Sequence, residues 1–145
     1  MTYKNQPITT SEALQAIYLD FEGRGKNKDH IAPPPSVCGL LIEEEYQFCI
    51  LDPKLEDLAR AKNYPYYKDL KTFVKFVIQK CESENRRIVY WSSHERNEFK
   101  EQGYPIDQIG FDLKRPAKNH FSDLFKKFKK DSRKFRSRDV ARSTK

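Results

Sequence analysis

A short run that is apolar on one side and acidic on the other constrains this chain most. From Ile17 to Glu22 the apolar residues Ile17, Leu19 and Phe21 alternate with residues that include Asp20 and Glu22. Successive side chains of a β-strand point to opposite faces, so the pattern predicts a strand with one buried face and two carboxylates on the other. Such acids can simply meet water. They also lie about 7 Å apart along a strand, and hard oxygen ligands of this kind suit Mg²⁺ or Mn²⁺.

The segments that follow predict a mixed sheet with helices on it. Two apolar runs, 37–42 and 46–51, flank three glutamates at 43–45. This predicts a hairpin with a solvated tip, and an antiparallel meander of three strands with the first strand. Apolar residues at helical spacing predict a helix from about Tyr66 to Glu82, and 86–91 predicts a fourth strand. Because a helix precedes that strand, we expect it to be parallel to a neighbour in the sheet.

The two ends of the chain show weaker patterns. Residues 1–11 are polar and predict a loose start. After the fourth strand we expect a short charged helix from Ser92 to about Gly103, and a connecting region without a strand as far as Pro116. A last helix is then predicted from an apolar stripe among lysines, formed by Phe121, Leu124, Phe125, Phe128 and Phe135.

The charge distribution divides the chain into a domain at 1–125 and a basic tail at 126–145. The chain of 145 residues has a net charge of +7, and the tail alone holds ten Lys or Arg against two Asp, so the basic excess lies in the tail. We expect the tail to finish the last helix and then to be disordered. It could remain solvated, or it could bind the phosphates of nucleic acid. The candidate phosphate-binding residues are Lys126, Lys127, Lys129, Lys130, Arg133, Lys134, Arg136 and Arg138.

Hydropathy and cysteine content bear on the cellular environment. No apolar run is long enough to cross a bilayer, and no basic and apolar leader opens the sequence. The cysteines are odd in number, lack metal-ligand spacing and lie in apolar runs; they are Cys38, Cys49 and Cys81. We therefore expect buried free thiols, a cytoplasmic protein and no membrane partner.

Further candidate site residues follow the fourth strand. Ser92-x-x-Glu95 fits a helix-capping box, and Glu95 could equally be a metal ligand near the first strand. His94 could act as a general base or lie on the surface. Asp123 could ligate metal or stabilise the start of a helix. Tyr90 and Trp91 could stack on bases or belong to the core.

Taken in order, these motifs resemble the RNase H-like fold of the DnaQ-type 3′-5′ exonuclease superfamily, which is DEDD-like. The chain looks most similar to the branch of predicted RecB-family nucleases with an RNase H-like domain. Asp20 and Glu22 match the Asp-x-Glu of the first strand, and Glu95 matches the second carboxylate, which follows a strand ending in Tyr. Asp123 resembles the acid of a later Asp-Leu segment. A final aspartate of that family has no match, because Asp139 lies among cations.

The resemblance implies an α/β, RNase H-like mixed sheet and a nuclease that uses two Mg²⁺ or Mn²⁺ ions. Asp20 would bridge the metals, and Glu22 and Glu95 would complete their coordination. The implied substrate is nucleic acid, with 3′-5′ exonuclease action on single-stranded ends. The unmatched final aspartate supports an alternative, which is a catalytically degenerate module that binds nucleic acid or a partner protein.

Overall fold

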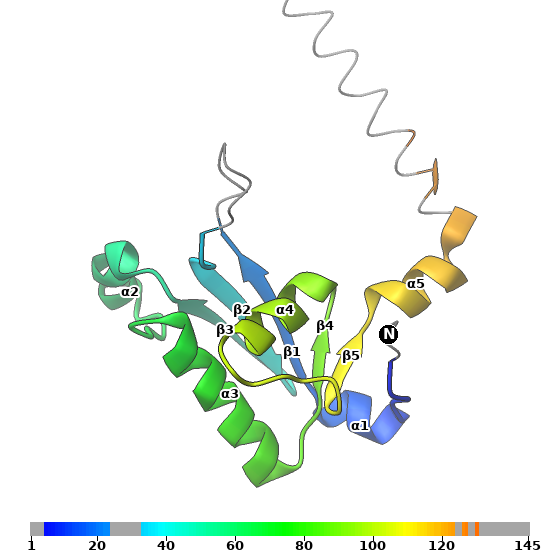
Figure 1. Cartoon of the computed structure of the whole chain (residues 1–145). Helices are drawn as coiled ribbons and strands as arrows, with labels where there is room; N and C mark the ends of the chain where they lie inside the picture. The colour runs from blue at the N-terminus through cyan, green and yellow to red at the C-terminus, as the bar shows by residue number, and fades with distance from the viewer. Residues whose placement is uncertain (1–4, 24–32, 124–125, 128–129, 131–145) are drawn as a thin grey trace, which may run out of the picture. The chain divides into compact units, whose positions relative to one another are not determined.

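The computed structural model of this protein describes residues 5–23, 33–123, 126, 127 and 130. Contacts within the chain separate it into two units, residues 1–113 and residues 114–145. The first unit holds the sheet and the helices that cover it, and it is the unit in which Asp20, Glu22 and Glu95 lie (Figure 1).

The first unit is built on a five-stranded mixed sheet in the order β3-β2-β1-β4-β5. Its strands are β1 (Ile17–Glu22), β2 (Val37–Ile42), β3 (Glu45–Ile50), β4 (Ile88–Tyr90) and β5 (Gly110–Asp112). The antiparallel meander β1–β2–β3 is confirmed, and so is the parallel pairing of β4 with β1. β5 extends the parallel half of the sheet beside β4.

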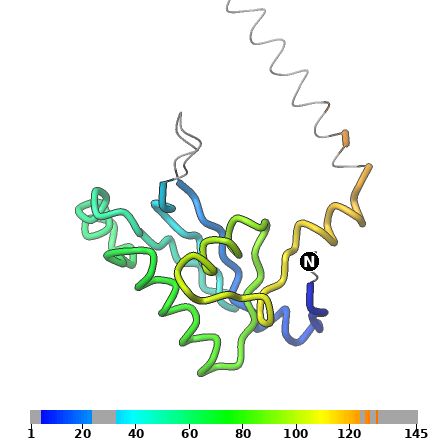
Figure 2. Tube along the Cα trace, viewed as in Figure 1, coloured from blue at the N-terminus to red at the C-terminus, as the bar shows by residue number. Residues whose placement is uncertain are grey.

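One face of the sheet carries the core, as Figure 2 shows with α3 and α4 lying over the strands. α3 (Leu70–Glu84) buries Phe73, Val74 and Val77, and α4 (Ser93–Glu101) buries Phe99. Phe21 of β1 packs against the rings of Phe73 and Phe99, with centroids 6.0 and 6.1 Å apart. The apolar side of the first strand therefore faces the helices, as its alternation predicts.

Several boundaries differ from those predicted from the sequence. α3 begins at Leu70 and not at about Tyr66, because the Asp69 carboxylate accepts a hydrogen bond from Thr72 N and caps the helix there. The start of the chain is not loose throughout, since a capping box between Thr9 and Glu12 begins α1 (Thr10–Gln15). A 3₁₀ turn (Pro53–Leu55) and α2 (Glu56–Lys62) occupy a stretch for which no element was predicted.

The region predicted as a connection without a strand contains β5, whose edge is covered by the N-terminal segment. Asn5 donates through Nδ2 to Asp112 O (2.9 Å) and accepts at Oδ1 from Asp112 N (3.0 Å), so its amide replaces a neighbouring strand. Arg87 donates to the carbonyl oxygens of Gln6 and Pro7 and also to those of Ile109 and Gly110. These contacts tie the start of the chain to β4 and β5.

The second unit begins with α5 (Lys114–His120), which holds Lys114, Arg115 and Lys118 and no acid. It starts earlier than the predicted last helix and includes Pro116 near its N-terminus, a position that proline tolerates. Of the predicted apolar stripe, Phe121 is exposed, and Leu124, Phe125, Phe128 and Phe135 lie outside the described residues.

Two expectations about the chemistry of the chain can be compared with the structure. All three cysteines are buried free thiols, as predicted. Burial raises the pKa of Cys49 to about 11 and that of Cys81 to about 12, so both are neutral at pH 7. Across the described ranges, no helix has the length and apolar character needed to cross a membrane.

Candidate functional site

Asp20 lies at the point where the two central strands separate. β1 and β4 run side by side only as far as the pair Leu19 and Tyr90, while β1 continues through Glu22. Asp20 and Glu22 are exposed and alternate with the buried Leu19 and Phe21, so both carboxylates lie on the face opposite the core. The carboxyl end of parallel strands is where α/β sheets usually bind ligands.

Glu95 reaches this edge of the sheet from the first turn of α4. Its side chain is 2% exposed, and its Oε2 accepts hydrogen bonds from Ser92 N (3.1 Å) and Ser92 Oγ (3.0 Å). The capping box suggested by the sequence is therefore present. Burial raises the pKa of Glu95, the hydrogen bonds from Ser92 and from the backbone of Glu95 oppose that shift, and the negative charge of Asp20 adds a smaller upward contribution.

The electrostatic interaction between Asp20 and Glu95 links two elements that are far apart in the sequence. Two carboxylates in mutual repulsion, one of them buried, form an environment that a divalent cation would stabilise. The cap does not use the whole of Glu95, because a carboxylate has two oxygens and both Ser92 bonds fall on Oε2. One side chain can thus cap α4 and present its other oxygen to a cation.

The neighbouring His94 lies at the surface. Its side chain is 47% exposed, and Nδ1 is 3.9 Å from Oε1 of Glu98, one turn further along α4. Burial raises the pKa of Glu98, while His94 opposes that shift. This places the imidazole beside a carboxylate on the outside of α4.

Asp112 is an acid of this edge that the sequence reasoning missed. It ends β5, is 4% exposed, and aligns with Tyr90 and Leu19 across the three parallel strands. The side-chain amide of Asn5 bonds both the backbone N–H and the backbone carbonyl of Asp112. The local signal is weak, because Asp112 follows only the short stretch Ile109-Gly110-Phe111, which is not long enough to predict a strand.

Asp20 and Glu22 also line a hollow on the face of the sheet opposite α3, which we call the outer groove. Its volume is about 340 Å³. Its lining is largely apolar and aromatic, and the charged residues along it are Asp20 and Glu22. The lining residues are Tyr18, Leu19, Asp20, Glu22, Val37, Gly39, Leu41, Tyr46, Phe48, Val89, Tyr90, Trp91 and Leu113.

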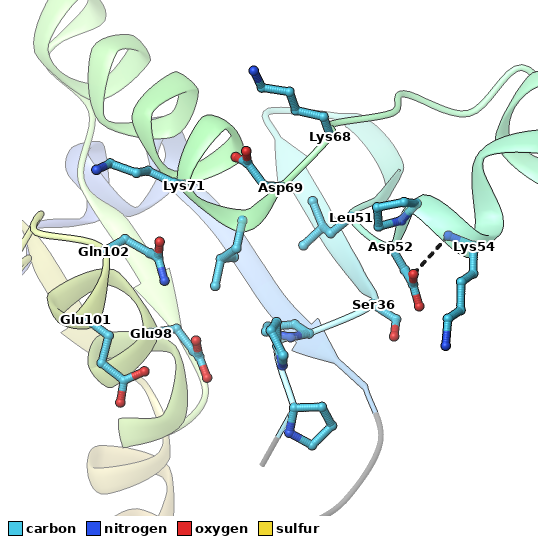
Figure 3. A pocket seen from close by; sticks show the side chains of 15 residues that line it. Ser36, Leu51, Asp52, Lys54, Lys68, Asp69, Lys71, Glu98, Glu101 and Gln102 are labelled. Carbon is cyan, nitrogen blue, oxygen red and sulfur yellow. Dashed lines mark hydrogen bonds between the residues drawn. The ribbon is translucent and has the colours of Figure 1, made fainter. Parts of the chain in front are cut away.

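A larger cavity of about 700 Å³ lies elsewhere, between the start of α3, α4 and the segment Pro33–Ser36 (Figure 3). Acids and lysines from separate elements line it together, among them Asp52, Lys54, Asp69, Lys71 and Glu98. Asp69 and Asp52 are engaged in hydrogen bonds to the backbone of the turns that they begin. Since Asp20, Glu22 and Glu95 are not among its lining residues, size alone does not identify the site predicted from the sequence.

The other predicted site residues lie outside the first unit. Asp123 is exposed and belongs to the second unit. Lys126, Lys127 and Lys130 are exposed, whereas Lys129, Arg133, Lys134, Arg136 and Arg138 lie outside the described residues. Within the part of the chain that the structure describes, no three His, Cys, Asp or Glu side chains are grouped so as to hold a metal ion.

Comparison with known proteins adds no assignment. A scan against protein-family models, a search of curated proteins and a search of solved structures each find no match to this chain.

Proposed function

We propose that this chain is a metal-dependent nuclease with an RNase H-like sheet, which hydrolyses phosphodiester bonds of nucleic acid. The order and direction of the strands support the fold, because an antiparallel meander is joined to parallel strands at β1. That arrangement is the one implied by the resemblance of the sequence to DnaQ-type exonucleases.

The observation that carries the proposal is the interaction of Asp20 with Glu95. The two carboxylates come from β1 and from the helix that follows β4, and the charge of Asp20 contributes to the raised pKa of Glu95. A purely structural cap would not require a second acid beside it. Buried and exposed carboxylates that converge at strand ends are a frequent basis of Mg²⁺ or Mn²⁺ sites in phosphoryl-transfer enzymes.

The residues present fit a divalent cation chemically, since carboxylate oxygens are its preferred ligands. Asp20 and Glu95 would supply ligands to it, and Glu22, which is not grouped with them in this structure, would have to turn toward them to complete the set. The ion, or a pair of ions, would lower the pKa of a bound water and stabilise charge on the phosphate. Asp20 would hold the cation at the separation of β1 and β4, and Ser92 would orient Glu95 through its hydrogen bonds.

A second candidate function is a module that binds nucleic acid or a protein without catalysis. It is favoured by the complete capping box of Glu95 and by the lack of a group of three metal ligands among the described residues. Under this alternative Asp20 and Glu22 are acids of a solvated face.

Cleavage of end-labelled single-stranded DNA and RNA separates the two functions. We expect products with Mg²⁺ or Mn²⁺, none with EDTA, and none from Asp20→Asn. Asp57→Asn, an exposed acid on α2, is the matched control and retains activity. Binding without cleavage under all metal conditions would support the non-catalytic module, and full activity of Asp20→Asn would contradict the proposed site.

A further inference from the structure

Two exposed aromatic rings flank Asp20 in the outer groove. Asp20 pairs with Gly39 of β2, and the exposed ring of Tyr46 on β3 lies over that glycine. On the other side, Trp91 follows Tyr90, the residue paired with Leu19, and therefore comes level with Asp20 where β4 ends. Neighbouring strands are about 4.8 Å apart, so Asp20 lies within one or two strand spacings of each aromatic side chain.

Gly39 allows the side chain of Tyr46 to approach Asp20. A Cβ at position 39 would lie 2.9 Å from the Tyr46 hydroxyl oxygen, so the phenol lies over the glycine, the strand neighbour of Asp20. Tyr46 is nonetheless 65% exposed. Its ring lies against the sheet at one end and is open to a ligand along most of its surface.

Trp91 offers a second ring on the opposite side of Asp20. It is 41% exposed, whereas its neighbour Tyr90 is 1% exposed and belongs to the core. Strand alternation explains this difference, because adjacent residues point to opposite faces. Both aromatics that could stack on bases according to the sequence line the outer groove, but Trp91 is the exposed one of the two.

We propose that Tyr46 and Trp91 form an aromatic clamp that stacks on the bases on either side of the phosphate at Asp20. This inference rests on the proposed nuclease function and specifies its substrate as single-stranded nucleic acid. Stacking requires base faces that duplex pairing covers, and aromatic side chains bind such faces with little preference for sequence.

The chemistry of the outer groove favours single-stranded nucleic acid over a purely apolar ligand. A nucleotide combines a flat apolar ring with an anionic phosphate. The aromatic lining suits the ring, and a cation held by Asp20 and Glu22 would attract the phosphate.

The intrinsic fluorescence of Trp91 tests the clamp directly, because Trp91 is the single tryptophan of the chain. The full chain is titrated with a twelve-residue oligothymidylate in Mg²⁺, and with an abasic strand of the same length and charge. We expect the oligothymidylate to quench the emission and the abasic strand to leave it nearly unchanged. Tyr46→Ala and Trp91→Ala should each weaken binding about tenfold, as loss of one stacked base predicts. For Trp91→Ala, a labelled oligonucleotide replaces the fluorescence readout.

Matched variants distinguish the clamp from general damage. Trp91→Phe keeps a ring and should retain most of the affinity, and Phe121→Ala removes an exposed ring outside the groove and should change nothing. A preference for single strands over duplex should be reduced in Tyr46→Ala while metal-dependent cleavage persists.

Three results would overturn the clamp. Equal quenching by the abasic strand would show contact with the backbone alone. Unchanged affinity for the oligothymidylate in both Tyr46→Ala and Trp91→Ala would reject the clamp and leave the nuclease standing. If Trp91 emits like a buried tryptophan in the full chain and becomes exposed only after residues 121–145 are deleted, the chain itself fills the groove. If Asp20→Asn cleaves like the unmodified chain, the proposed active site fails, whatever the quenching shows.

Discussion

At the scale of single residues, the buried carboxylate of Glu95 caps α4 at a cost in stability. Its carboxylate is buried, and burial disfavours the charged form. Because its pKa is higher in the folded than in the unfolded chain, the folded state holds the proton more tightly. The free energy of unfolding therefore falls as pH rises through the interval between the two pKa values, and it stays lower above that interval.

Glu95→Gln should remove this cost and retain the cap, since an amide oxygen can still accept from Ser92. In EDTA, we subtract the melting temperature of the unmodified chain from that of Glu95→Gln at each pH. We expect this difference to increase from pH 4 to pH 7. Thermal unfolding across that range is the measurement. Metal-dependent cleavage should be lost at the same time. If cleavage persists in Glu95→Gln, the residue is a cap alone, and Asp20 must act with other ligands.

At two glycines of the sheet, Gly39 and Gly110, atoms of other residues lie close to the position that a Cβ would occupy, but the surroundings of the two differ. An added Cβ at Gly110 would lie 2.7 Å from the carbonyl oxygen of Ile106 and 2.9 Å from the Tyr90 ring, both in the packed interior. At Gly39 the nearest atom is the far end of the exposed Tyr46 side chain. We expect Gly110→Ala to lower the free energy of unfolding by about 2 kcal/mol, as overpacking does, and Gly39→Ala to lower it by less than about 1 kcal/mol. Denaturant titration compares them; equal losses would contradict the assignment of Gly39 to an open surface.

At the scale of elements, β5 depends on a side chain for its outer hydrogen bonds. The Asn5 amide occupies both the N–H and the carbonyl of Asp112, as a neighbouring strand would. An exposed strand edge is otherwise prone to pair with other chains. The N-terminal segment thus completes the sheet without adding a strand to it.

Asn5→Ala should open the edge of β5. Loss of two hydrogen bonds from partly buried backbone predicts a decrease of about 2 kcal/mol in the free energy of unfolding, together with faster exchange of the Asp112 amide proton. Hydrogen exchange followed by NMR measures the local effect. Gln6→Ala is the control, because Gln6 is exposed and contacts Arg87 through its backbone carbonyl. Unchanged exchange at Asp112 in Asn5→Ala would show that the edge is protected in another way.

The elements that the sequence predicted correctly are those whose apolar pattern is long or bounded by clear turns. β1, β2 and β3 alternate or run continuously over six residues, and α3 repeats its buried positions over four turns. β5 has three residues and is specified by its contacts with β4 and Asn5, which no local pattern records. α1 and α2 are short and bury few residues. Their positions in the sequence therefore depend more on their caps and adjoining turns than on apolar periodicity.

The same distinction applies to the candidate site. The positions of Asp20 and Glu22 on one face follow from strand alternation, and the Ser92–Glu95 capping box follows from its spacing. The approach of Glu95 to Asp20 depends on α4 packing over β1, and the burial of Asp112 depends on a strand that the sequence did not predict. The exposure of Trp91 likewise depends on the end of β4 at Tyr90, one residue earlier.

At the scale of the whole molecule, binding of a divalent ion should stabilise the folded chain. An ion that binds the folded state at a hundred times its dissociation constant adds about 2.7 kcal/mol to the free energy of unfolding. We expect Mn²⁺ to raise the melting temperature of the unmodified chain and of Asp57→Asn, and to have little effect on Asp20→Asn. Thermal scans with and without EDTA measure this shift. Equal shifts in all three proteins would place the ion away from Asp20.

The basic residues at the end of the chain should govern the salt dependence of nucleic-acid binding. Each phosphate contact on a single strand contributes about 0.7 to the slope of log K against log salt concentration. Deleting residues 126–145 removes ten Lys or Arg and should reduce that slope by several units. Titrations at a series of salt concentrations measure it. A slope that is unchanged by the deletion would assign the phosphate contacts to residues before Lys126.

The position of β1 in the sheet has a consequence for the order in which the molecule folds. β1 joins β2 and β3 through sequence neighbours, but its pairing with β4 closes a loop that contains α2 and α3. Contacts of low sequence separation form faster, because less chain entropy is lost in making them. During synthesis the meander can assemble while α4 is still within the ribosome. Asp20 is then in place early, and the proposed site is complete only when Glu95 emerges and β4 docks.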